Sequence, residues 1–387
     1  MRPRRSLATV LAATGITLLV GLAIKWPCVT GDWADGRQYR RLCYTDIVPL
    51  YTARGIDDGR VPYLEARNEY PVLTGAAMWA AGVPARSYAS FFGWTAAMLA
   101  AAAFATAWAL HRLVGRRALF FAAAPTLAIY GFMNWDLLAV APATLAVLLY
   151  PAGRYLASGA LLGLGAAAKL YPALFVLPLG LRRLQRGDRT GAIRLAAAAL
   201  AVWSALNLIV AIAAPDGWAE FFRFSAERPA DWDSLWLLAG HHLGWPRDTG
   251  TVNAAAALSF LGLAALTWWR AARRRPGFPA WTFAFPLLVL FLVTSKVYSP
   301  QFSLWLLPWF ALALPHLGLF VVFSAAEVAV FVTRFTWFAN VEAHPFPAPE
   351  FQAAIVVRAI VLLACVAAWV RRPAPEVTPE TRSEAAR

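Results

Sequence analysis

Charged residues are scarce in this sequence, and their scarcity restricts the class of protein. They make up 14% of 387 residues, whereas hydrophobic residues make up 60%, and the mean hydropathy is +0.55. This composition excludes an ordinary soluble domain. Apolar runs of about 17–25 residues, long enough to cross a bilayer core, recur at 7–24, 88–110, 195–214 and 353–370. The sequence therefore predicts an all-α, multi-pass membrane protein of about ten to twelve helices.

The net charge of +14 does not indicate nucleic-acid binding, because the arginines cluster in short connections beside the apolar runs. By the positive-inside rule these connections are cytoplasmic; they fall at 112–117, 182–194, 270–275 and 371–372. The long loops 25–70 and 215–250 carry acids and tryptophans instead, and are predicted to be extracytoplasmic. We expect one integral membrane domain over residues 1–372 with both termini inside, and a disordered cytoplasmic tail at 373–387.

The chain has only three cysteines and five histidines. Cys28 and Cys43 lie in the first outside loop, where an oxidising compartment permits a disulfide, although two unpaired thiols fit the sequence equally well. Cys365 lies in the last apolar run and is interpreted as a small apolar filler. The pair at 241–242 has no Cys or His partner at metal-ligand spacing, so no metal site is predicted.

Lysine is rarer still, with three in the chain. Lys169 interrupts the apolar stretch GAAAKLYPALF, where a charge costs roughly 2.5–3.5 kcal/mol and needs a partner, a wet cavity or an anionic ligand. The apolar runs around it, at 118–133, 137–150, 155–168 and 170–180, are short for a full crossing. Broken helices of this kind are tolerated where protein buries them or a cavity receives their ends. Residues 70–83 are either a short span or a re-entrant helix.

Alternation of inside and outside connections brings several polar segments to one face. Residues 134–136, 169–172 and 294–302 all fall on the side of the acidic first loop. A wet site with Lys169, Lys296 and several carboxylates, flanked by apolar helices, suits a ligand with an anionic head and a lipid tail. A compact ammonium group is a good partner for phosphate.

Six segments, in the same order along most of the chain, resemble glycosyltransferase family 87. They are CYTDIVPLY (43–51), GRVPYLEARNEYPVLTG (59–75), MNWDLLAVA (133–141), GLGAAAKLYP (163–172), FFRFSAERPADWDSLW (221–236) and SKVYSPQFSLWLLP (295–308). The resemblance implies the GT-C fold and a polyprenyl-phosphate-mannose-dependent α-1,2-mannosyltransferase of the actinobacterial cell envelope. It implies a plasma-membrane enzyme whose active site faces outside. Its partners would be a polyprenyl-phosphate-sugar donor and a glycolipid or lipoglycan acceptor, with no nucleic acid.

The resemblance also implies a catalytic acid at Asp46, in the first outside loop. Many members carry two adjacent acids here, whereas this chain has Thr45 before Asp46 and Ile47 after it. The departure weakens any case for a divalent metal, so no cofactor is predicted, but one carboxylate suffices as a general base. The sequence has no Walker loop and no Gly-rich dinucleotide fingerprint, which favours a lipid-linked donor over a nucleotide sugar.

Each candidate residue also has a structural interpretation. Asp46 is a general base or an N-cap, and Asp136 a sugar contact or the cap of the helix from 137. Lys169 and Lys296 are phosphate contacts or members of structural ion pairs. Additional candidates for substrate contact are Tyr171, Tyr298, Gln301, Glu69 and Tyr70. Arg334 either contacts phosphate or snorkels to the interface.

Two other function classes remain open at this point. A lipid-linked-sugar flippase or transporter also carries intramembrane charges and broken helices, although no internal repeat relates the halves of this chain. A non-catalytic scaffold would not need lysines on apolar segments. Donor sugars other than mannose, such as arabinose or glucose, also fit.

Overall fold

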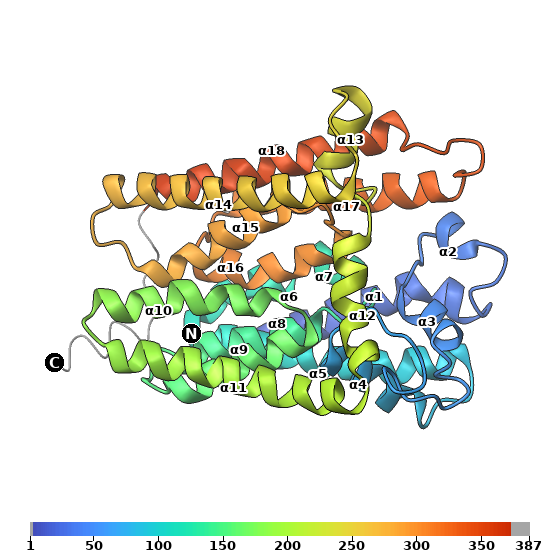
Figure 1. Ribbon diagram of the computed structural model, residues 1–387, viewed down its shortest axis with the longest axis horizontal. Coiled ribbons are helices and arrows are strands. Elements are labelled where there is room, and N and C mark those ends of the chain that lie inside the picture. The colour runs from blue at the N-terminus through green and yellow to red at the C-terminus, as the bar shows by residue number, and fades with distance from the viewer. Residues whose placement is uncertain (1–2, 373–387) are drawn as a thin grey trace.

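The computed structural model describes residues 3–372 and is all-helical over that range (Figure 1). The predicted tail at 373–387 lies outside the described residues. Within 3–372, six helices are long and apolar enough to cross a membrane. They are α1 (Pro3–Val29), α5 (Tyr88–Val114), α11 (Arg189–Ala213), α14 (Thr249–Arg274), α17 (Leu317–Phe338) and α18 (Pro349–Arg371).

Four further apolar helices within these residues are shorter, at 10–17 residues, than the six that are long enough to cross. They are α4 (Val72–Gly82), α8 (Leu137–Leu149), α9 (Tyr155–Ala168) and α15 (Ala284–Thr294), the last preceded by the 3₁₀ turn η3 (Ala280–Phe283). The eleven residues of α4 span only about 16 Å at 1.5 Å per residue, roughly half a bilayer core. Residues 70–83 are therefore too short for a full span.

The remaining elements inside the bundle are short and interrupt the chain, most of them near prolines. They are η1 (Gly115–Ala118), α6 (Leu119–Ala122), α7 (Pro125–Tyr130), η2 (Tyr171–Phe175), α10 (Val176–Gln185), η4 (Pro300–Leu306) and α16 (Leu307–Leu312). Proline has no N–H to donate and fixes its own φ, so it begins a helix more easily than it continues one. Each of α7, η2 and η4 carries a proline in its first two positions. These interruptions place polar backbone between apolar segments.

Most large buried side chains form one continuous apolar core. It includes Phe91, Phe132, Trp135, Phe285 and Phe310, each at most 1% exposed. The exposed faces of α1, α11 and α14 are also apolar, with residues such as Ile16, Ile212 and Leu258 more than 60% exposed. An exposed apolar surface on long helices is the surface that lipid covers.

One end of the bundle, here called the loop face, carries residues 30–70 and 214–248. Its short helices are α2 (Arg37–Arg40), α3 (Ile47–Ala53), α12 (Pro215–Glu227) and α13 (Leu235–His242). In Figure 1 the long helices run side by side, and α12 lies across their ends at the loop face. The α10–α11 and α14–α15 connections lie at the opposite end, where α1 begins and α18 ends.

Candidate active site

A cavity of about 550 Å³ lies at the loop face. Segments distant in sequence meet around it: the first loop, the break before α8, the break after α9, the end of α12 and the 295–302 segment. Its polar lining is Tyr44, Asp46, Glu69, Tyr70, Asn134, Lys169, Tyr171, Ser225, Arg228, Asp231, Ser295, Lys296, Ser299, Gln301 and Arg334. The predicted convergence of polar segments on one face is thus present as a single cavity.

Asp46 is held in this cavity by three side-chain donors. Its Oδ1 accepts a hydrogen bond from the Tyr44 hydroxyl at 2.6 Å, and its Oδ2 accepts from Asn134 at 2.8 Å and Gln301 at 3.1 Å. Asp46 directly precedes α3, yet its side chain caps no backbone N–H of that helix. A carboxylate offers about four acceptor positions, so one remains for a substrate hydroxyl.

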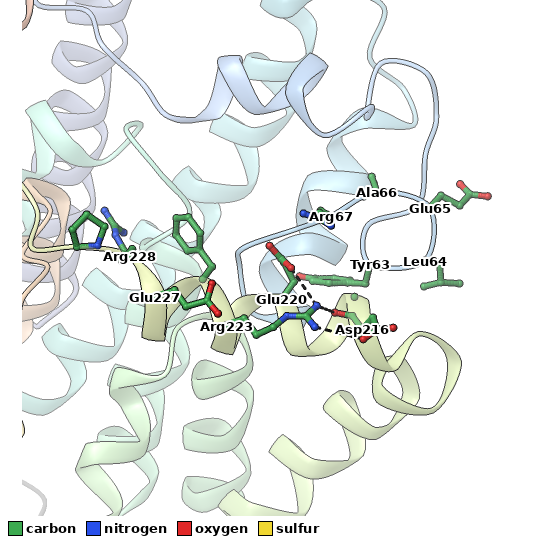
Figure 2. Close-up of a pocket in the computed structure, with 13 residues that line it drawn as sticks. Tyr63, Leu64, Glu65, Ala66, Arg67, Asp216, Glu220, Arg223, Glu227 and Arg228 are labelled. Atoms are coloured by element: carbon green, nitrogen blue, oxygen red, sulfur yellow. Dashed lines mark hydrogen bonds and ion pairs between the residues drawn. The ribbon is translucent and has the colours of Figure 1, made fainter. Parts of the chain in front are cut away.

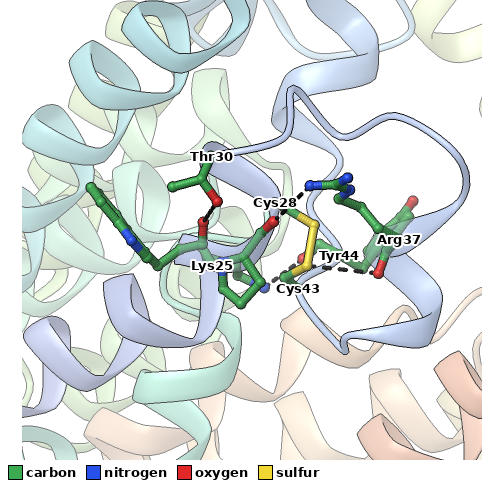
Figure 3. The surroundings of a disulfide bond; sticks show 8 residues. Lys25, Cys28, Thr30, Arg37, Cys43 and Tyr44 are labelled. Carbon is green, nitrogen blue, oxygen red and sulfur yellow. Dashed lines mark hydrogen bonds between the residues drawn. A yellow bond between two sulfur atoms is a disulfide. The ribbon is translucent and has the colours of Figure 1, made fainter.

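The backbone around Asp46 is fixed to the break before α8. The Asp46 N–H donates to the Met133 carbonyl at 2.8 Å, and the Thr45 hydroxyl lies 3.0 Å from the Phe132 carbonyl. Upstream, Cys28 and Cys43 form a disulfide with a Cα–Cα distance of 5.9 Å. Beside it, Lys25 is fully buried and donates to the Tyr44 carbonyl (Figure 3). These contacts give the carboxylate a defined position.

The hydroxyl of Tyr44 stays protonated. Burial, followed by the neighbouring Asp46 carboxylate, raises the pKa of Tyr44 well above its ordinary value. A neutral phenol can donate its proton to the carboxylate, which a phenolate could not. Tyr44 therefore acts as a hydrogen-bond donor to Asp46 at neutral pH.

Lys169 lies where α9 stops. Its backbone is extended, and the preceding Ala168 carbonyl accepts a hydrogen bond from the Thr74 hydroxyl at 2.8 Å, which satisfies a helix-end carbonyl. The ammonium lies 3.8 Å from Asp136 Oδ1, and 4.9 Å and 5.4 Å from the ring centres of Tyr70 and Phe302. Lys169 thus lines the cavity and has an ion partner behind it.

Two predicted contacts, Asp136 and Tyr298, do not line the cavity. Asp136 is fully buried behind Lys169, and its Oδ1 accepts from Trp305 Nε1 at 2.7 Å. It forms no side-chain cap on α8. The Tyr298 hydroxyl lies 3.1 Å from Ser303 Oγ and 3.4 Å from Glu327 Oε1, in a buried polar cluster. Sequence position alone cannot show that these two side chains point away from the cavity.

The other predicted residues do line it. Lys296 is buried and donates to the Ala226 carbonyl at 2.9 Å, and no carboxylate of residues 3–372 lies within ion-pair distance of it. Burial lowers the pKa of Lys296. Glu69 forms a two-point ion pair with Arg54 at 2.8 Å and 2.9 Å, while the Tyr70 hydroxyl accepts from Asn134 at 2.8 Å.

Among the lining residues that were not predicted as site residues are Tyr44, Asn134, Arg228 and Asp231. All four lie within the quoted motifs, but a motif does not show which of its side chains faces a ligand. Arg334 pairs with buried Asp233 at 2.7 Å with 12% of its side chain exposed, so the alternative that it snorkels is wrong. Arg334, like Lys169, is a charged residue within an apolar run, and this sequence signal could have identified it as a cavity residue.

The geometry defines a multi-pass membrane protein with three carboxylates, Asp46, Glu69 and Asp231, and four cations, Lys169, Arg228, Lys296 and Arg334, around one cavity. Among residues 3–372, no group of three His, Cys, Asp or Glu side chains is placed to hold a metal ion.

The model of glycosyltransferase family 87 matches residues 69–300. The chain belongs to that family and is a membrane glycosyltransferase. No curated protein matches it significantly. Among solved structures, it is similar to ArnT from Cupriavidus metallidurans bound to undecaprenyl phosphate, at 14% identity and a TM-score of 0.47, over 92% of this chain and 76% of that one.

Proposed function

We propose that the protein is an inverting glycosyltransferase with Asp46 as its general base. It moves a sugar, mannose, from a polyprenyl-phosphate donor to a glycolipid or polysaccharide acceptor. The observation that carries this proposal is the position of Asp46. Its carboxylate caps no helix and lines a cavity that also contains Lys169, Lys296, Arg228 and Arg334. Membership of family 87 supports the lipid-linked donor, and the mannose rests on the family resemblance.

The donor phosphate would bind between Lys169 and Lys296. Lys296 has no carboxylate partner within residues 3–372, so an anion is its natural partner. Lys169 lies 3.8 Å from Asp136 Oδ1, and because Lys169 lines the cavity while Asp136 does not, a phosphate in the cavity would approach the ammonium from the side away from that carboxylate. The polyprenyl chain would leave along the aromatic side of the cavity, which Phe221, Phe291 and Phe302 line.

The reaction is a direct displacement. The acceptor hydroxyl oxygen attacks the anomeric carbon as the bond from that carbon to the phosphate oxygen breaks. The hydroxyl proton passes to Asp46, and polyprenyl phosphate leaves with the bonding electrons. Lys169 and Lys296 stabilise the charge that develops on the departing phosphate. A single displacement inverts the anomeric centre, so a β-linked donor gives an α-linked product.

We place the loop face outside the plasma membrane. The arginine-rich α10–α11 and α14–α15 connections lie at the opposite end of the bundle, and the positive-inside rule makes that end cytoplasmic. The disulfide between Cys28 and Cys43, at the loop face, fits the same orientation because oxidising compartments lie outside the cytoplasm.

Purified protein in detergent, given radiolabelled polyprenyl-phosphate-mannose and a panel of membrane-lipid acceptors, tests the proposal. We expect donor consumption and a labelled product, since an enzyme needs no sealed compartment. Labelled donors carrying glucose or arabinose, tested in parallel, identify the sugar. An absence of transfer from every donor, combined with lipid movement across sealed proteoliposomes, would instead establish a flippase.

Replacing Lys169 should weaken donor use. The double variant Lys169→Met/Asp136→Asn removes the cation without leaving a buried carboxylate unpaired, and is expected to lower kcat/KM for the donor by about 10²–10³-fold, the usual effect of removing one group that stabilises transition-state charge. Lys169→Arg should recover part of the loss. Unchanged donor kcat/KM in a folded double variant would make Lys169 a structural residue.

A further inference from the structure

A second cavity, of about 840 Å³, adjoins the first at the loop face. Residues 63–67 of the first loop form one wall and α12 the other (Figure 2). Phe224 and Arg228 line both cavities, so the second, here called the α12 groove, continues to the site of Asp46. Its volume is that of a site for a ligand of substantial size.

The α12 groove is polar and nearly balanced in charge. Four of its lining residues are acidic and three are arginines: Glu65, Asp216, Glu220, Glu227, Arg67, Arg223 and Arg228. Arg223 is already paired, at 3.5 Å with Asp216 and 3.3 Å with Glu220. With no surplus of cations, the groove does not favour a phosphate or another polyanion. Its chemistry suits an uncharged ligand with many hydroxyl groups.

Two side chains of the groove are available to such a ligand. Within residues 3–372, neither Arg67 nor Glu227 has a side-chain hydrogen bond or an ion pair, and both are exposed. A guanidinium donates to hydroxyl oxygens, while a carboxylate accepts from hydroxyl groups. Phe224 is 39% exposed between them and the first cavity, and it offers a flat apolar surface to the C–H face of a sugar.

The walls of the groove are held rigidly together. Tyr63 has a φ of 72°, which is uncommon for a side chain of its size, and its hydroxyl lies 2.8 Å from the Pro71 carbonyl. Gly217 of α12 approaches Tyr63 so closely that a Cβ there would lie 2.0 Å from the Tyr63 carbonyl oxygen. Strained backbone maintained by close packing is characteristic of functional sites.

We propose that the α12 groove binds the acceptor as an uncharged oligosaccharide. Its terminal sugar passes Phe224 and Arg228 to place a hydroxyl at Asp46, and its preceding sugars contact Arg67 and Glu227. This inference rests on the proposed function and specifies the acceptor: a chain of several neutral sugars, rather than a single sugar or a phosphorylated headgroup.

The test compares acceptors of different length. Neutral alkyl glycosides of mannose, glucose or arabinose, with one, two or four sugars, are supplied to wild type and Arg67→Ala/Glu227→Ala at saturating labelled donor. The double variant should raise KM for the four-sugar acceptor about 10- to 100-fold through the loss of two charge-assisted hydrogen bonds. The KM for the one-sugar acceptor should not change, and neither should the KM for the donor, which is measured separately by varying the donor.

A matched control is Asp58→Ala/Arg60→Ala, which removes the same two charge types, one acid and one arginine, from exposed positions of the first loop outside both cavities. It should behave as wild type. Equal KM for the four-sugar acceptor in wild type and the groove variant would overturn the inference, as would a preference of wild type for phosphorylated acceptors. Both leave the proposed function standing, since wild type still transfers sugar. If wild type consumes no donor with any acceptor, the proposed function itself fails, and the groove assignment with it.

Discussion

Asp46→Asn is expected to reduce sugar transfer by about 10²–10⁴-fold, the usual contribution of a positioned general base. The amide keeps the size of the side chain: its oxygen can replace Oδ2 as the acceptor from Asn134 and Gln301, and its NH2 can replace Oδ1 by donating to the Tyr44 hydroxyl oxygen. It cannot take the acceptor proton, so kcat should fall more than donor KM rises. The measurement is initial-rate transfer from radiolabelled donor by purified wild type and variant.

The structure supplies a close control in Asp58→Asn. Asp58 is an exposed acid of the same loop and lines neither cavity, so this variant should retain full activity. Both variants should keep the wild-type thermal unfolding midpoint in detergent. Full activity in a folded Asp46→Asn variant would remove Asp46 as the base. Glu69 and Asp231 would then be the remaining acids of the cavity lining.

Hydropathy alone predicted much of the fold. The six long apolar helices within residues 3–372 agree with the multi-pass prediction based on run length, because the bilayer requires apolar surface of a fixed length. The breaks at 134–136 and 169–172 were predicted from the short runs around them. The length of α4 was not, because an apolar stretch does not show where its polar flanks end.

The site was only partly predictable, and the reason is side-chain direction. A lysine in an apolar run must have a counter-charge or a cavity, so Lys169 was identified from sequence. Asp136 is also a buried charge that needs a counter-charge, and Lys169 supplies it. Asp136 therefore faces Lys169 from behind the cavity wall. Tyr298 and Gln301 lie three residues apart around the start of η4, yet one faces a buried cluster and the other Asp46. That difference depends on the turn geometry, which residue types do not specify.

The buried cluster that receives Tyr298 links the loop face to the bundle. Arg358 of α18 is 1% exposed and lies 4.0 Å from Glu327 of α17. Its guanidinium lies 3.7 Å from the Tyr298 ring centre, and its Nη2 donates to the Asp233 carbonyl at 3.1 Å. Asp233 is also paired with Arg334 of the cavity lining. Arg358 thus holds together α17, the 231–234 segment and the segment that carries Lys296.

Arg358→Met is therefore expected to destabilise the protein by about 3–5 kcal/mol, because removing one partner leaves Glu327 buried without its counter-charge. Arg358→Met/Glu327→Gln should recover much of the loss, since both charges are then absent. The measurement is the free energy of unfolding in mixed detergent micelles at increasing SDS mole fraction, followed by tryptophan fluorescence.

The matched control is Arg371→Met, which removes an exposed arginine from the end of the same helix and should change stability by no more than about 0.5 kcal/mol. If Arg358→Met were no less stable than Arg371→Met, the cluster would not be holding the two parts together. If the cluster positions Lys296 as described, the folded fraction of Arg358→Met should also show a raised donor KM, whereas Arg371→Met should not. A stability loss without that change in KM would confine Arg358 to the scaffold and separate the cluster from substrate binding.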